Sequence, residues 1–143
     1  MAGPQFFTPR SVSPSRPRRR FSLDQANRSL PLVKRIVADI VRTHGDAAKL
    51  QQRMERGSKR DQPAMQLQLE AAMHKLEDYV DELSEVGCEL KDYQMGLIDF
   101  TGRHQGRDVC LCWRLGEDRI LYWHELDTGF AGRQPVSVLQ EGD

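Results

Sequence analysis

The chain lacks the features that would place it in several large protein classes. It has no apolar run approaching the roughly 20 residues that a membrane-spanning helix needs, and no apolar stretch of the secretory-signal kind at its start. Only 3 cysteines occur among 143 residues. They are too few for a disulfide framework, and with an odd number one cysteine would have no partner. We therefore expect a soluble protein of a reducing, cytoplasmic compartment.

Net charge and nucleotide-binding motifs are also missing. The 21 basic and 21 acidic residues cancel, so the whole molecule has no bias toward nucleic acid or membranes. Its glycines match neither the dinucleotide fingerprint nor a Walker-type phosphate loop. Cys110 and Cys112 have no second short-spaced pair of ligands elsewhere in the chain, as a zinc site would require. The sequence thus predicts no cofactor and contains no recognisable catalytic motif.

The first residues differ in composition from the rest. Residues 1–20 contain five arginines and no acidic residue, together with many prolines and serines. Such a segment buries too little apolar surface to offset the entropy of ordering, so we expect a disordered tail. A solubilising role is favoured, and weak nucleic-acid binding is the alternative. The arginines that would make that contact are Arg16, Arg18, Arg19 and Arg20.

A helix start is marked at Ser22. Ser22 followed by Gln25 is a capping-box pattern, in which two side chains satisfy two free backbone N–H groups. Proline removes a hydrogen bond inside a helix but suits its first turn. We therefore expect a short helical turn, Leu23 to Ser29, and a separate long helix that begins at Pro31.

Apolar residues then recur every three or four positions along two segments. The first begins at Pro31, and the second runs from Pro63 to Gly87, a residue that suits a helix C-cap. A polar stretch at residues 56–61 separates them. Two long helices joined by a short polar loop form an antiparallel hairpin, so we expect one over about residues 31–86, with a solvated tip.

After Gly87 the periodicity changes to two. Alternating segments separated by glycine-containing turns predict a small antiparallel meander over about residues 88–127. Such a meander has too little core alone, so the hairpin should cover one face. The fold class is therefore α+β, a long antiparallel helical hairpin packed on a three- to four-stranded antiparallel sheet. This domain would span residues 21–136, followed by a flexible tail at 137–143.

The end of the domain is expected to be a strap. Residues 128–136 contain glycines on both sides of Phe130, followed by Arg133. In the favoured interpretation Phe130 fills a gap against the sheet, and Arg133 pairs with Glu117 or Asp127. In the alternative the loop closes over a small anionic ligand, since the planar guanidinium suits carboxylates and phosphates.

Polar and aromatic side chains in the last strands mark the best location for a functional site. Strand alternation places Tyr122 and His124 on one face and Glu125 on the other. His124 needs a carboxylate from a neighbouring strand, and Asp99 is the best candidate if their strands are adjacent. A structural histidine is favoured over a general base or metal ligand. The ligand-binding candidates are Asp99, Arg114, Glu117, Tyr122, His124, Glu125 and Arg133.

The two cysteines of this region share one strand face. Cys110 and Cys112 would have Cβ atoms about 7 Å apart, which is too far for a disulfide. A bent strand would allow both to approach a metal, and with His124 they are the weak metal candidates. Two small, half-buried hydrophobic residues are the favoured interpretation, and no metal is expected.

Several sequence blocks carry a family likeness. They are FSLDQANRSLP from residue 21, GCELKD from residue 87, GLIDF from residue 96 and a long block from Leu111 to Pro135. Over residues 21–136 the chain resembles a bacterial family of unknown function, DUF2203. The resemblance implies the same hairpin-and-sheet fold. It implies no activity, cofactor, substrate or catalytic residue.

The extended shape and the missing catalytic constellation favour a non-enzymatic interaction or scaffold protein. Its hairpin or a sheet edge would bind a partner protein or a second copy of the chain, and no membrane association is expected. The alternative is a small-ligand- or metal-binding protein, or an enzyme, whose site is the polar set on the sheet. The two are distinguished by whether those groups converge on an open pocket or satisfy one another inside the fold.

Overall fold

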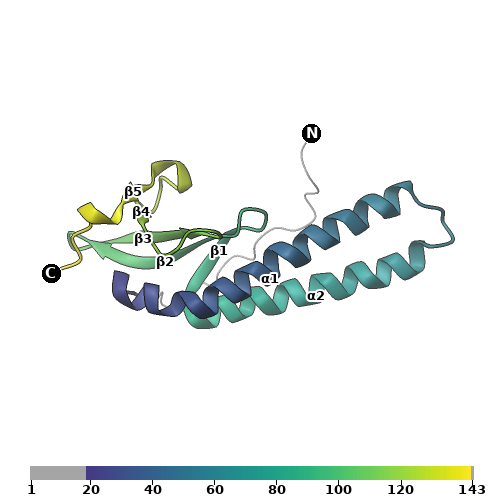
Figure 1. Cartoon of the computed structure of the whole chain (residues 1–143), viewed down its shortest axis with the longest axis horizontal. Helices are drawn as coiled ribbons and strands as arrows, with labels where there is room; N and C mark the ends of the chain where they lie inside the picture. Colours follow the sequence, from purple (N-terminus) through teal and green to yellow (C-terminus); the bar gives the residue numbers. More distant parts are fainter. Residues whose placement is uncertain (1–18, 143) are drawn as a thin grey trace.

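Two long helices precede a five-stranded antiparallel sheet, whose strands follow one another in chain order. The computed structural model describes residues 19–142. The elements are α1 Leu23–Arg56, α2 Gln62–Val86, β1 Cys88–Asp92, β2 Leu97–His104, β3 Arg107–Arg114, β4 Tyr122–His124 and β5 Gln134–Pro135, with 3-10 turns η1 Phe130–Gly132 and η2 Val136–Val138. One half of the hairpin lies against the sheet and the other half projects beyond it (Figure 1). The predicted α+β class is confirmed.

The start of α1 is capped as predicted. The backbone N–H of Gln25 donates to Ser22 Oγ at 3.0 Å, and the N–H of Ser22 donates to Gln25 Oε1 at 2.9 Å. The preceding residue, Phe21, is only 4 % exposed and packs edge-on against Phe100, with ring centroids 4.8 Å apart. Phe21 therefore ties the helix start to the sheet.

Helix α1 runs without interruption through Pro31, so the predicted division into a short turn and a later long helix was wrong. Pro31 is exposed, and the carbonyl four residues earlier, in Asn27, loses its helical N–H partner. Leu30 and Val33 on either side are buried in the core, at 3 % and 0 % exposure. Burial of this apolar stripe outweighs one lost hydrogen bond, and the helix continues.

Replacing Pro31 by alanine is expected to raise the free energy of unfolding by about 1–3 kcal/mol, because alanine restores the missing bond inside α1. Pro63 is the matched control. It lies in the first turn of α2, where its N–H would have no helical partner, so Pro63→Ala should have a smaller effect. Urea unfolding followed by circular dichroism measures both. Equal effects would show that Pro31 imposes no cost specific to a helix interior.

The turn after α2 depends on Gly87. Its backbone is left-handed, with φ 115°, and its N–H donates to the carbonyl of Leu83 at 3.0 Å. This C-cap confirms the sequence prediction. A Cβ on Gly87 would lie 2.8 Å from the ring of Phe21, so glycine is needed there for space as well as for conformation. The cap directs the chain from α2 straight into β1.

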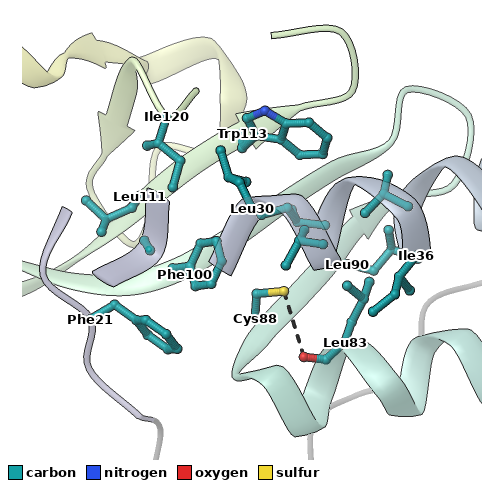
Figure 2. Packing of buried hydrophobic residues seen from close by; sticks show 14 of the residues in the cluster. Phe21, Leu30, Ile36, Leu83, Cys88, Leu90, Phe100, Leu111, Trp113 and Ile120 are labelled. Atoms are coloured by element: carbon teal, nitrogen blue, oxygen red, sulfur yellow. Dashed lines mark hydrogen bonds between the residues drawn. The ribbon is translucent and has the colours of Figure 1, made fainter. Parts of the chain in front are cut away.

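The main core lies between the inner half of the hairpin and one face of the sheet (Figure 2). Trp113 and Leu111 of β3 are both 0 % exposed, which confirms the predicted apolar face of this strand. Cys88 donates its thiol to the carbonyl of Leu83 at 3.8 Å, and burial raises the pKa of that thiol to about 12. A second, smaller cluster holds the projecting half of the hairpin together; its buried members are Ala47, Leu50 and Leu69. Across residues 19–142, no helix combines the length and apolarity needed to cross a membrane.

The strap adds a fifth strand that periodicity did not predict. Strand β5 pairs with β4, and the N–H of Val136 donates to the carbonyl of Leu121 at 2.9 Å. Two residues are too few to show an alternating pattern, so only the tertiary pairing reveals this strand. Strand β4 itself comprises only three residues, Tyr122–His124. Backbone pairing with the strap covers the edge that β4 would otherwise expose.

The residues after the strap are docked, although the sequence predicted a flexible tail from residue 137. The N–H of Gln140 donates to His104 Nδ1 at 2.9 Å, and the N–H of Leu23 donates to Glu141 Oε1 at 2.8 Å. Glu141 thus places a carboxylate at the N-terminus of α1, where free N–H groups and the helix dipole favour an anion. His104 is the buried last residue of β2.

The ordered domain also begins earlier than predicted. The Nε of Arg20 donates to Asp108 Oδ1 at 2.7 Å, and the guanidinium of Arg19 lies 4.6 Å from the ring centre of Phe21. Both arginines were assigned to a disordered tail, but each contacts the folded domain. Residues 1–18, which include the other arginines of the predicted nucleic-acid contact, lie outside the described residues.

Candidate functional site

A buried polar cluster occupies the face of the sheet opposite the core. It consists of Asp99 on β2, Cys112 on β3 and His124 on β4, which are 6 %, 0 % and 3 % exposed. In the strand register Asp99 lies opposite Cys112, and His124 lies opposite Cys110. One side-chain atom of each cluster residue lies within 4.8 Å of the others. We call these three residues the sheet cluster.

Asp99 and His124 pair across an intervening strand. Nε2 of His124 lies 3.1 Å from each carboxylate oxygen of Asp99. The sequence tied this pairing to adjacent strands, which was wrong, because β3 lies between β2 and β4. The side chains meet above β3 because the residues of that strand opposite His124 and Asp99 are small cysteines, Cys110 and Cys112. A larger residue there would separate them.

Both ring nitrogens of His124 face oxygen atoms, which defines its protonation. Nδ1 lies 2.7 Å from the carbonyl oxygen of Glu125, and a carbonyl only accepts, so Nδ1 carries a hydrogen. The remaining nitrogen, Nε2, shares a proton with Asp99. The hydrogen bond to Asp99 raises the pKa of His124, although burial opposes the shift. Asp99 and His124 therefore form a hydrogen-bonded acid–base pair inside the fold.

Cys112 is a poor nucleophile in this arrangement. Burial raises the pKa of its thiol to about 12, and the nearby charge of Asp99 acts in the same direction, while Arg133 opposes it. The thiolate, which is the reactive form, is therefore disfavoured. His124 turns Nε2 toward Asp99 and has no free lone pair to accept the thiol proton. The geometry thus does not support a cysteine–histidine nucleophilic mechanism.

Arg133 organises a second polar group beside the sheet cluster. Its Nη2 donates to the two oxygens of Glu117 at 2.6 and 2.9 Å, so the predicted pairing with Glu117 is present. Its guanidinium also lies 4.1 Å from the ring centre of Tyr122. Phe130 was predicted to fill a gap against the sheet, but it is 36 % exposed. The guanidinium occupies the space beside Tyr122 and contacts Phe130 from the inner side, at 4.7 Å from its ring centre.

The side chains of the two remaining sequence-predicted residues, Glu125 and Arg114, belong to neither group; only their backbone atoms contact them. Glu125 forms an ion pair with Arg107 of β3, and the hydrogen bond from that guanidinium lowers the pKa of Glu125. Arg114 is exposed at the end of β3; its backbone N–H donates to Glu117 Oε1 at 2.8 Å. The seven candidates therefore form a buried pair, an Arg133-centred group and two surface positions. They do not converge on one open site.

Sequence reasoning undervalued Cys112. It grouped Cys112 with Cys110 as two half-buried hydrophobic residues, whereas both are buried and only Cys112 belongs to the sheet cluster. The distinguishing signal is the register, because Asp99 lies directly opposite Cys112 and not opposite Cys110. That register depends on the β2–β3 turn, which sequence periodicity locates only approximately.

Basic side chains predominate at the tip of the hairpin, and acidic side chains predominate on the half of α2 nearest the sheet. Five exposed basic residues lie at or near the tip, together with two exposed acids, Glu55 and Asp61, and five exposed acidic residues lie on the half of α2 nearest the sheet. We call these the basic tip and the acidic segment. The basic tip comprises Lys49, Arg53, Arg56, Lys59 and Arg60. The acidic segment comprises Glu77, Asp78, Asp81, Glu82 and Glu85.

The described residues thus form an α+β protein with a projecting helical hairpin and a closed polar cluster on its sheet. The model of an uncharacterised conserved protein family, DUF2203, matches residues 19–136. The match covers most of the chain, and the chain therefore belongs to this family, as the sequence blocks indicated. No curated protein and no solved structure matches it.

Proposed function

We propose that this protein is a non-enzymatic interaction protein whose hairpin binds a second copy of the chain. The observation that carries the proposal is the charge separation between the basic tip and the acidic segment on an exposed, projecting hairpin. The polar residues of the sheet satisfy one another, so they offer little support for an open catalytic pocket. The hairpin is the larger exposed feature and the better candidate for binding.

The geometry of the hairpin suits an antiparallel pairing of two copies. From the loop between the helices to the middle of the acidic segment, α2 extends about 30 Å, at about 1.5 Å per residue. Two antiparallel hairpins would place each basic tip against the partner's acidic segment. The same contact would then occur twice about a twofold axis, as in most homodimers.

The contact would be largely electrostatic. The apolar stripe of α2 is already used against α1, where Leu69, Leu76 and Leu83 are buried. On the outer surface of α2, Leu67 is 68 % exposed and adds one apolar contact. Exposed ion pairs contribute only about 0.2–1 kcal/mol each, so we expect a weak, salt-sensitive dimer whose charges define its register.

Charge reversal at either end of the hairpin is expected to give monomers. One variant carries Arg53→Glu with Lys59→Glu, and the other carries Glu77→Lys with Glu82→Lys. An equal mixture of the two should associate, because each reversed end then meets its complement. Sedimentation velocity at low and physiological salt measures all three samples, together with the wild type.

Arg119→Glu, an exposed charge in the loop before β4, is the control and should sediment like the wild type. If the wild type remains monomeric at low salt and high concentration, the proposed self-association is wrong. It is also wrong if the charge-reversed variants fail to associate when mixed.

We further propose a cytoplasmic location. Cys88, Cys110 and Cys112 are all free, which is typical of proteins in reducing compartments. Nucleic-acid binding receives less support, since Arg20 is engaged by Asp108 within the domain.

A further inference from the structure

We propose that the sheet cluster of Asp99, Cys112 and His124 is a binding site for a divalent transition-metal ion, with Zn²⁺ the best suited. The three residues offer one oxygen, one sulfur and one nitrogen ligand from three neighbouring strands. Mixed nitrogen, sulfur and carboxylate ligands are typical of Zn²⁺. This proposal departs from the expectation, drawn from the sequence, that no metal binds.

The distances in the sheet cluster are close to those of a tetrahedral site. Zinc bonds of about 2.0–2.3 Å place neighbouring ligand atoms about 3.4–3.6 Å apart. Nε2 of His124 lies 3.1 Å from the oxygens of Asp99, and all three ligand atoms lie within 4.8 Å of one another. Side-chain movements of about 1 Å would complete the geometry, leaving a fourth position for water or a small ligand.

His124 is already oriented for coordination. Its Nδ1–H donates to the carbonyl oxygen of Glu125 at 2.7 Å, which fixes the ring plane and directs Nε2 into the sheet cluster. Metal-binding histidines usually donate their second N–H to a carbonyl or carboxylate in this way. The carbonyl belongs to the residue directly after β4. The pairing of β4 with β3 holds this part of the backbone in place.

Charge balance favours a divalent ion. Metal ligands coordinate in their deprotonated forms, so the two positive charges of Zn²⁺ would face one carboxylate, one thiolate and a neutral imidazole. With Zn²⁺ bound the sheet cluster would be neutral, whereas an ion of any other charge would leave a net charge buried.

The site is closed to solvent, which determines how it would be loaded. The three residues are at most 6 % exposed, and the guanidinium of Arg133 in the strap interacts with Cys112. An ion would therefore enter during folding or when the strap opens, and it would exchange slowly. A bound ion stabilises the folded state because the unfolded chain does not present the three ligands together.

The test begins with wild-type protein that has been unfolded in chelator and refolded with or without Zn²⁺. We expect one equivalent of zinc to remain after gel filtration, a raised thermal midpoint, and proton release on binding in calorimetry across buffers of different ionisation enthalpy. Refolded protein that retains no zinc, with ion in excess during refolding, would overturn the assignment.

A matched pair of cysteine variants separates the site from general metal affinity. Cys112→Ser removes a ligand and should weaken zinc binding more than about 100-fold. Cys110→Ser changes the same strand face two residues away, outside the sheet cluster, and should bind like the wild type. Equal binding by both variants would contradict the proposal.

Cobalt supplies a readout that does not depend on variant stability. Wild-type protein refolded with Co²⁺ should show a sulfur-to-metal charge-transfer band, because Cys112 coordinates as a thiolate. The band should persist in Cys110→Ser and disappear in Cys112→Ser. Bound cobalt in the wild type without this band would exclude Cys112 as a ligand and reject the site as proposed.

Discussion

Replacing Asp99 by alanine is expected to lower the free energy of unfolding by about 3–5 kcal/mol. Asp99 is 6 % exposed, and both of its oxygens lie 3.1 Å from Nε2 of His124. Without the carboxylate, His124 must either bury an unpaired positive charge or give up a proton that the pair now holds. Both outcomes cost the folded state free energy. Denaturation in the presence of chelator measures the change without a contribution from bound metal.

Two further variants make this prediction specific. Adding His124→Ala to Asp99→Ala should cost less than the sum of the single effects, because the pair is lost only once. Glu125→Ala removes the ion pair between Glu125 and Arg107 at the surface of the same sheet. It should lower the free energy of unfolding much less. If Asp99→Ala and Glu125→Ala were equally mild, the Asp99–His124 pair would not be a buried ion pair.

Replacing Trp113 by alanine is expected to cost about 3–5 kcal/mol, the range for deleting a large buried aromatic side chain. Trp113 is 0 % exposed and belongs to the buried core (Figure 2). Its Nε1 donates to the carbonyl of Glu117 at 3.0 Å. The substitution leaves a cavity and also an unsatisfied carbonyl. Urea unfolding followed by far-ultraviolet circular dichroism measures the loss.

Trp113→Phe divides this effect between its two causes. Phenylalanine fills most of the cavity but donates no hydrogen bond, so we expect an intermediate loss of about 1–3 kcal/mol. Phe130→Ala is the control for an aromatic side chain at the surface and should change stability by less than about 0.5 kcal/mol. A loss at Phe130 as large as that at Trp113 would contradict the described core.

The helices were largely predictable because their signals are local. The capping box at Ser22, the proline in the first turn of α2 and the left-handed Gly87 each act within a few residues. Pro31 is the exception. Its local preference against a helix interior was correctly recognised. The helix nevertheless continues because the residues around Pro31 are buried, and their burial depends on the tertiary structure.

The site was predictable only as a set of residue types. Sequence reasoning identified His124, Asp99 and the Arg133–Glu117 pair as chemically complementary. It did not predict that Asp99 reaches His124 across β3, because that contact depends on small residues in the strand between them. It also assigned Phe130 to the interior on hydrophobicity alone, whereas Arg133 occupies the space beside Tyr122.

Patterns within short stretches of the sequence thus define the α+β class, the hairpin and the apolar face of the sheet, since each depends on neighbours a few positions apart. The tertiary structure decided the continuity of α1, the fifth strand, the docked C-terminus and the sheet cluster. Each of these joins residues distant in the chain, such as Leu23 with Glu141 and Asp99 with His124. Their free energy comes from burial and strand register, which exist only once the whole domain has folded.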